Sequence, residues 1–230
     1  MSIADNLLKY KSEIESEGVK LVAVSKNHPA EAVKEAYDAG QRVFGENLVQ
    51  EMVEKQAQLP IDIEWHLIGH LQTNKVKYIA SFVKLIESVD SLKLLKEIDK
   101  QAAKNKRVID CLLQIYIADE ETKFGLGFDE AIELLRSEEF ETLKNVRIVG
   151  LMGIATNTAQ EKQTSVEFNE LKVLFDGIKV GFFRKEDSFK EISMGMSGDY
   201  KIAIEEGSTM VRIGTNIFGK RVIKHWKNKE

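Results

Sequence analysis

Lys26 is the residue whose type and position best suit nucleophilic chemistry. It directly follows the apolar run Leu21–Ser25, which has the composition of a buried strand. Partial burial of an amine disfavours its charged form, and the neutral amine is a good nucleophile toward an aldehyde. Position alone leaves a second interpretation open, an ordinary lysine at a strand end whose ammonium group reaches into water.

Two glycine-containing turns near the C-terminus could bind a phosphate group. Ser193–Asp199 ends one apolar run and precedes a helical segment, and Val211–Thr215 repeats this pattern one unit later. Phosphate often binds to backbone N–H groups and hydroxyls in such turns, where glycine lets the backbone approach the anion. A pair of ordinary turns explains the pattern equally well. The chain has no Gly-x-Gly-x-x-Gly or Walker-type loop, which argues against a dinucleotide or nucleoside triphosphate site.

Metal and thiol chemistry have weaker support. His66 and His70 are four residues apart, but a zinc site needs three or four ligands, and no acidic or cysteine partner has convincing spacing. We expect His66 to pack in or near a strand and His70 to lie in the following loop. Cys111 is the only cysteine, which excludes an intrachain disulfide, and its apolar surroundings predict a buried, inert thiol.

The elements that must position these residues are eight short apolar runs separated by segments of helical period. Most runs are continuous rather than alternating, as in parallel strands that are covered on both faces. The predicted strands are Lys20–Ser25, Arg42–Gly45, Glu64–Ile68, Val83–Val89, Ile109–Ile117, Val146–Met152, Glu191–Met194 and Met210–Ile213.

Helix signals fill the segments between the runs. Pro29 opens and Gly40 closes the helix after the first run, and Ser91 can cap another. Residues Ser2–Glu15 predict an extra helix before the first strand. The stretch Gly177–Lys190, with two glycines and a charged run, predicts a long surface excursion.

Repeated strand–helix units predict an α/β fold with a parallel sheet and right-handed crossovers. We expect residues 1–230 to form one domain, a (β/α)8 TIM-type barrel with an extra N-terminal helix and no second domain. An open doubly wound sheet is the alternative, and the count of eight strands favours the closed barrel. In a barrel the residues that follow the strands would converge on one rim.

Composition excludes several classes of partner. The 33 Lys+Arg and 37 Asp+Glu residues leave a net charge of −4, which argues against a dedicated nucleic-acid surface. No apolar stretch approaches the roughly 20 residues that span a bilayer, and the N-terminus has no features of a signal peptide. We therefore expect a cytoplasmic protein with no membrane or nucleic-acid partner.

Taken together, the motifs resemble one family, the YggS/PROSC-type pyridoxal phosphate homeostasis proteins. The resemblance covers nearly the whole chain. Its fold is similar to the barrel domain of alanine racemase, without that enzyme's second, β-rich domain. The matching stretches are Ala23–Lys26, Phe44–Asn47 with Gln50, Trp65–Gln72 with Lys75, Gly150–Met152, Ser193–Ser197 with Asp199, and Val211–Thr215 with Phe218 and Gly219. The segment Gly153–Thr158 departs from the family pattern because it lacks a proline after the Gly-Leu-Met motif.

The resemblance implies that pyridoxal 5′-phosphate (PLP) is the cofactor and that Lys26 holds it as a Schiff base. Seven further residues are implied as cofactor-binding. Of these, Ser197, Gly214 and Thr215 hold the phosphate, Arg212 lies against the pyridine nitrogen, and Asn47, His66 and Met152 line the pocket.

Arg212 argues against amino-acid chemistry. Most PLP enzymes place a carboxylate at the pyridine nitrogen, whereas arginine can only donate and favours an unprotonated nitrogen, which weakens carbanion stabilisation. Racemases also take a second acid or base from the domain expected to be missing here. We expect a non-catalytic, monomeric PLP-binding protein that acts in intracellular vitamin B6 and amino-acid homeostasis. A fold-type III enzyme, such as an amino-acid racemase or decarboxylase, is the alternative. Whether PLP-dependent apo-enzymes receive the cofactor is left open.

Overall fold

The eight predicted strands all form, and they close into a parallel barrel. The computed structural model describes residues 2–119 and 124–220. The strands are neighbours in chain order, and the barrel closes where the last strand pairs with the first. Their boundaries differ from the predicted ones by one or two residues at most. They are β1 Lys20–Val24, β2 Val43–Glu46, β3 Glu64–Leu67, β4 Leu85–Val89, β5 Ile109–Ile115, β6 Val146–Gly153, β7 Glu191–Met196 and β8 Met210–Ile213.

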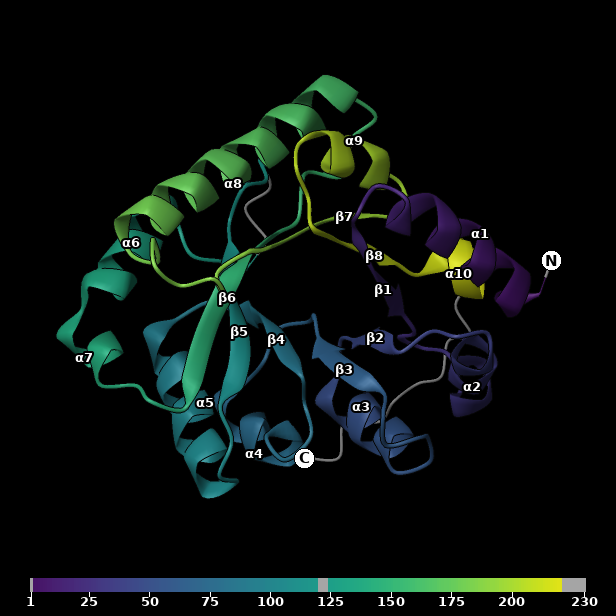
Figure 1. The fold of residues 1–230 in the computed structure, drawn as a ribbon, viewed down its shortest axis with the longest axis horizontal. Helices are drawn as coiled ribbons and strands as arrows, with labels where there is room; N and C mark the ends of the chain where they lie inside the picture. The colour runs from purple at the N-terminus through teal and green to yellow at the C-terminus, as the bar shows by residue number, and fades with distance from the viewer. Residues whose placement is uncertain (1, 120–123, 221–230) are drawn as a thin grey trace.

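Helices surround the ring of strands, and α1 lies beside α2 and α10 (Figure 1). The extra N-terminal helix is confirmed as α1. The helices are α1 Ile3–Glu15, α2 Ala30–Asp38, α3 Val49–Gln56, α4 Val76–Ile79, α5 Leu92–Lys104, α6 Phe128–Arg136, α7 Glu138–Glu141, α8 Glu161–Gly181, α9 Tyr200–Glu205 and α10 Thr215–Phe218, with a 3-10 turn at Thr73–Lys75.

The predicted helix ends have the expected chemistry. The Ser2 hydroxyl accepts from the backbone N–H of Asp5 at 3.1 Å, and the Asp5 carboxylate accepts from the Ser2 N–H in return, which forms a capping box. The Ser91 hydroxyl caps α5 in the same way by accepting from the N–H of Leu94. Pro29 directly precedes α2, as predicted.

The excursion predicted for Gly177–Lys190 is wrong for its first part. Helix α8 continues to Gly181. Phe189, at the end of the stretch, is fully buried, and its ring stacks on Phe175 at 4.8 Å and on Phe183 at 4.5 Å. Each helical glycine costs roughly 1 kcal/mol relative to alanine. Burying aromatic rings against the helix outweighs that cost.

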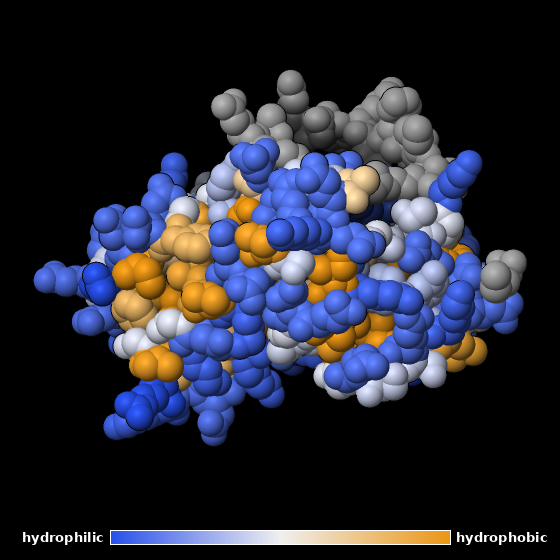
Figure 2. All heavy atoms as spheres, turned by 90° about the horizontal axis from the view of Figure 1, so that it is seen from above, coloured by the Kyte–Doolittle hydropathy of each residue, from blue (hydrophilic) through white to orange (hydrophobic). Residues whose placement is uncertain are grey.

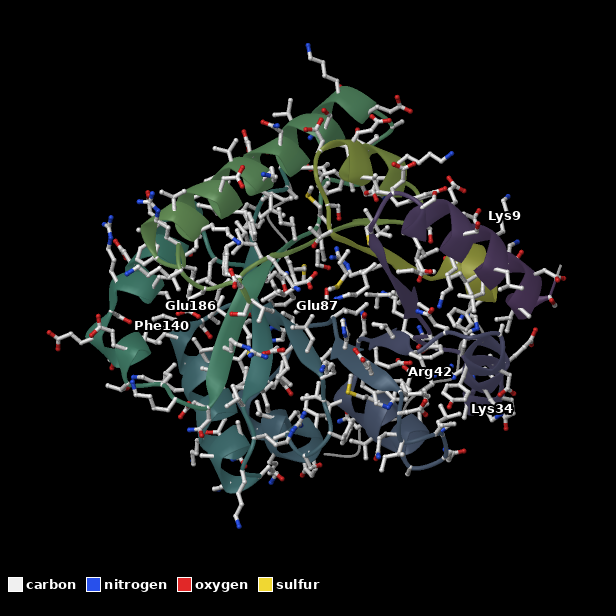
Figure 3. The ribbon with its side chains drawn as sticks, viewed as in Figure 1. Lys9, Lys34, Arg42, Glu87, Phe140 and Glu186 are labelled. Carbon is white, nitrogen blue, oxygen red and sulfur yellow. The ribbon has the colours of Figure 1, made fainter. Side chains whose placement is uncertain are left out.

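Two kinds of side chain fill the inside of the barrel. An apolar layer contains Val22, Leu85, Leu112, Met152 and Met210, all buried, as expected for a packed barrel interior. A polar layer centres on Glu87, whose label lies inside the ring of strands (Figure 3).

The surface carries mixed side chains. Figure 2 shows a face on which hydrophilic residues predominate, with smaller hydrophobic patches between them. Within residues 2–119 and 124–220, no helix combines the length and the apolar character needed to cross a bilayer. Cys111 is fully buried in β5, as predicted, and burial raises the pKa of its thiol.

A buried ion cluster joins β1, β2 and α3 behind the turn that carries Lys26. The Lys55 ammonium donates to Oε1 of Glu46 at 2.6 Å and to Oε1 of Glu51 at 2.8 Å. It also donates to the backbone oxygen of Ser25 at 2.8 Å, and the Ser25 hydroxyl donates to Oε1 of Glu46 at 2.6 Å. Burial raises the pKa of Glu46 to about 7, while the Lys55 charge opposes this shift and the Glu51 charge adds to it.

The close contact between β6 and β7 gives a test of the fold. A Cβ atom on Gly150 would lie 1.7 Å from the backbone oxygen of Glu191, whereas one on Gly177 in α8 would meet nothing within 4 Å. We expect Gly150→Ala to lower the free energy of unfolding by about 3 kcal/mol or more, because the strands would have to separate. The control, Gly177→Ala, should be neutral or stabilising by up to about 1 kcal/mol. Similar free energies of unfolding for the two variants, measured by urea denaturation, would contradict this strand pairing.

The raised pKa of Glu46 predicts that stability falls as the pH rises. Its pKa in the folded state is about 7, above the ordinary value of 4.5. Its contribution to stability is therefore complete below pH 4.5 and is lost as the pH rises through about 7. A shift of this size corresponds to a loss on the order of 3 kcal/mol. Glu46→Gln keeps the accepting oxygen but cannot ionise. Its free energy of unfolding should therefore depend less on pH than that of the natural chain between about pH 5 and pH 8.

The matched control for that comparison is Glu139→Gln, which removes a largely exposed carboxylate paired with Lys96. This variant should keep the pH dependence of the natural chain. The same pH dependence in Glu46→Gln as in the natural chain would show that Glu46 does not hold its proton in the folded state.

Candidate functional site

Residues at and after the ends of six strands line a cavity of about 290 Å3 at one rim of the barrel. Because parallel strands present their carboxyl ends at the same rim, residues far apart in the chain meet there. Six of the eight residues predicted for the site line this cavity: Lys26 after β1, Asn47 after β2, Ser197 after β7, Arg212 on β8, and Gly214 and Thr215 after β8.

Lys26 is carried by a tight turn between β1 and α2. The backbone N–H of His28 donates to the oxygen of Ser25 at 3.1 Å across this turn, and the His28 ring packs on Phe218 of α10 at 5.2 Å. Asn27 has a φ of +63°, in the left-handed region that residues other than glycine seldom adopt. The turn thus has a specific backbone conformation with Lys26 at its centre.

The turns after β7 and β8 meet in the cavity wall next to the end of β1. The backbone N–H of Gly214 donates to the Ser197 hydroxyl at 3.3 Å, and the Asn216 amide donates to the Ser197 oxygen at 3.1 Å. A Cβ on Gly214 would lie 3.1 Å from the backbone oxygen of Val24, so only glycine fits beside β1 without displacing it. Two hydroxyls, from Ser197 and Thr215, and a glycine backbone therefore share one wall.

Arg212 is held inside the barrel by a polar network. Its Nη1 donates to the Ser193 hydroxyl at 2.6 Å and its Nη2 to the oxygen of Gly153 at 2.9 Å. The Ser193 hydroxyl donates to Oε2 of Glu87 at 2.6 Å, and His66 Nδ1 lies 2.7 Å from Oε1 of the same carboxylate. The guanidinium is therefore oriented by partners on β4, β6 and β7.

The charges in this network compensate each other. Burial alone would raise the pKa of Glu87, but hydrogen bonds from His66 and Ser193 together with the His66 and Arg212 charges outweigh it, and the pKa is lowered. Burial lowers the pKa of Arg212, while the Glu87 and Asp199 charges oppose this. Glu87 is thus an ionised counter-charge 3.9 Å from the Arg212 guanidinium.

The cavity wall has the character of an anion site. Two basic side chains, Lys26 and Arg212, line it. Among the residues that the structure describes, no carboxylate does. A wall with basic groups and hydroxyls attracts negative charge.

Two of the predicted pocket residues do not line this cavity. Met152 is fully buried in the apolar layer inside the barrel. His66 packs within β3, as its sequence context predicted, and lines a separate cavity of about 230 Å3 at the opposite end of the strands. Strand side chains alternate in direction and stack in layers, so residues pointing into a lower layer do not reach the rim.

Glu87 and Ser193 belong to the site network but had no predicted role. The signal for Glu87 is present in the sequence, because it is the one charged residue in the strand Leu85–Val89. A buried charge requires partners, which marks such a position as part of a network. The sequence cannot identify the partners, since they come from other strands.

A second cavity of about 390 Å3 adjoins the first and shares Asn47, Ile68 and Ile154 with it. The His70 ring lies in its wall and stacks on Phe124 at 4.3 Å, with Nδ1 3.1 Å from Oδ2 of Asp90. His70 is thus in the loop after β3, as predicted. The described part of the chain contains no group of three or more acidic, histidine or cysteine residues suited to a metal ion.

Comparison with known proteins identifies relatives that match nearly the whole chain. The sequence model of one protein family, the alanine racemase N-terminal domain, matches residues 1–222. A curated pyridoxal phosphate homeostasis protein of Aquifex aeolicus is 42% identical and covers 88% of this chain and 87% of its own length. The structure of PipY from Synechococcus elongatus without PLP has a TM-score of 0.87 and 38% identity, over 95% of this chain and all of that one.

A second structure of PipY, with PLP bound, has a TM-score of 0.85 and 37% identity, again over 95% of this chain. The family match spans nearly the whole chain, and the similarities to curated relatives are well above the level at which only a fold is shared. The chain therefore belongs to the alanine racemase N-terminal domain family and, within it, to the pyridoxal phosphate homeostasis proteins.

Proposed function

We propose that this chain binds PLP in the Lys26 cavity without catalysing a reaction, and that it acts in vitamin B6 and amino-acid homeostasis in the cytoplasm. The observation that carries this proposal is the meeting of Lys26, Arg212 and the Ser197 and Thr215 hydroxyls around one cavity. Its relatives support it, because the curated Aquifex protein is named a pyridoxal phosphate homeostasis protein and PipY has been solved with PLP bound.

The residues fit the cofactor group by group. PLP supplies an aldehyde that reacts with amines and a pyridine ring that can accept electron density. Lys26 would hold the aldehyde carbon. The Ser197 and Thr215 hydroxyls and the backbone at Gly214 would hold the phosphate, and Arg212 would face the ring nitrogen. Asn47 would contact the ring from the wall after β2.

The same geometry argues against an amino-acid racemase or decarboxylase. The Arg212 guanidinium is bound to Ser193 and Gly153 and stays protonated, so it can only donate to the ring nitrogen. Apart from Arg212, Lys26 is the only acidic or basic side chain among the described residues that line the cavity. A racemase needs two such groups on opposite faces of the substrate.

The phosphate assignment can be tested with Ser197→Ala/Thr215→Ala. Each lost hydrogen bond to a charged group costs roughly 1.5–3 kcal/mol, so the affinity for PLP should fall by about a hundredfold or more. Pyridoxal, which lacks the phosphate, should lose little affinity. Exposed Ser81→Ala is the control. Borohydride reduction followed by mass spectrometry should place the label on Lys26. Equal losses for PLP and pyridoxal, or a label on another lysine, would contradict the assignment.

The absence of catalysis has its own test. Deuterium exchange at Cα of alanine, followed by NMR, should proceed with the PLP-loaded protein at the rate of free PLP, because the cavity provides a poor electron sink and one base. Racemisation of any common amino acid at about 1 s⁻¹ or faster, an ordinary enzymatic rate, would show that the chain is an enzyme.

A further inference from the structure

We propose that Lys55 is a positioning residue, which fixes the Ser25–Asn27 turn and thereby aims the Lys26 amine into the cavity. The inference rests on the proposed function of Lys26 as the residue that holds the cofactor. Lys55 does not line the cavity. It acts through the backbone on both sides of Lys26.

The turn contains one residue in the left-handed region, Asn27, with a φ of +63°. Asparagine adopts this region more readily than other residues with a side chain, but surrounding contacts are still needed to hold the turn in one conformation. Strand pairing does not supply those contacts, because the pairing of β1 with β2 ends at Val24 and Gly45. Beyond that point one ladder-like bond remains, from the Ser25 N–H to the Gly45 oxygen at 3.1 Å.

The ion cluster supplies the missing contacts on both sides of Lys26. Before it, the oxygen of Ser25 accepts from Lys55 at 2.8 Å and the Ser25 hydroxyl donates to Glu46 at 2.6 Å. After it, the backbone N–H of Asn27 donates to Oε1 of Glu51 at 2.7 Å. Two backbone atoms and one hydroxyl group on the residues flanking Lys26 are therefore held by side chains of β2 and α3.

Lys55 is the member on which the cluster depends. An ammonium group has three donors, and all three are used, one on Ser25 and one on each of Glu46 and Glu51. The two carboxylates are fully buried, and among the described residues their Oε2 atoms have no partner. Without Lys55 two buried carboxyl groups would face each other with no cation between them, and they could keep their present positions only at a large cost.

This placement matters because capture of an aldehyde by an amine is sensitive to geometry. A displacement of about 1 Å in a reacting group can lower a rate by about a hundredfold. A turn released at Ser25 and Asn27 would let Lys26 occupy several orientations, of which only some reach the cavity. The cluster thus provides the supporting contacts that a functional side chain requires.

The test compares Lys55→Met with Lys34→Met, which removes an exposed lysine paired with Asp38 on α2. The first measurement uses cofactor-free protein and follows hydrogen exchange at the Asn27 N–H. We expect exchange at the Asn27 N–H to be at least tenfold faster in Lys55→Met than in the natural chain, and unchanged in Lys34→Met. Amides within the β1–β2 pairing should keep their exchange rates in both variants. A merely structural role would instead accelerate exchange throughout the barrel.

The second measurement is the rate at which added PLP is captured on Lys26, followed by absorbance and located by borohydride reduction. Lys55→Met should be at least tenfold slower than the natural chain, and Lys34→Met should match it. If Lys55→Met does not fold, Glu46→Gln/Lys55→Met removes the ammonium together with one of the two carboxyl groups that it binds, and this variant still lacks the Lys55 bond to Ser25. The same changes are expected in that variant.

Unchanged exchange at Asn27 together with an unchanged capture rate in either variant would overturn the positioning role of Lys55. A natural chain that takes up no PLP on Lys26 would instead overturn the proposed function. The exchange measurement would still decide whether Lys55 holds the turn.

Discussion

Closure of the barrel by the pairing of β1 with β8 is the constraint on which the rest of the structure depends. The register runs from Lys20 opposite Met210 to Ala23 opposite Ile213. It brings the end of the chain's first strand beside the end of its last, so Lys26 and Thr215 line the same cavity although nearly the whole described chain separates them. The packing of Gly214 against Val24 is a direct consequence, since the two turns leave the barrel side by side.

The closed barrel also determines where charge can be buried. Removing a charged group from water is costly unless partners surround it, and a ring of strands can supply partners from several directions at once. Arg212 receives them from β4, β6 and β7. Lys55 receives them from the ends of β1 and β2 and from its own helix. One of these networks holds a side chain in the cavity wall, and the other holds the turn that carries Lys26.

Much of the fold could be predicted from local sequence signals. Continuous apolar runs identified every strand, because strands buried on both faces need such composition. Pro29 and Ser91 identified helix ends through their short-range chemistry. The surface excursion after Gly177 was wrong because two glycines and a charged run are local signals, whereas α8 is extended by aromatic packing with residues further along the chain. Likewise, the sequence could not tell which strand positions reach the rim.

The sequence by itself determined that Lys26, Ser197, Gly214 and Thr215 follow strands, and in a parallel barrel that is enough to bring them to one rim. Only the tertiary structure decided which residues lie in the barrel interior below this rim and which residues pair with them. His66 and Met152 point into the barrel interior, because side-chain direction follows the layer in which a strand residue lies. The partners of Glu87 and Lys55 are distant in sequence or on other elements. Hydrogen bonds and ion pairs act over a few ångströms in space, and the chain order alone does not show which groups come within that distance.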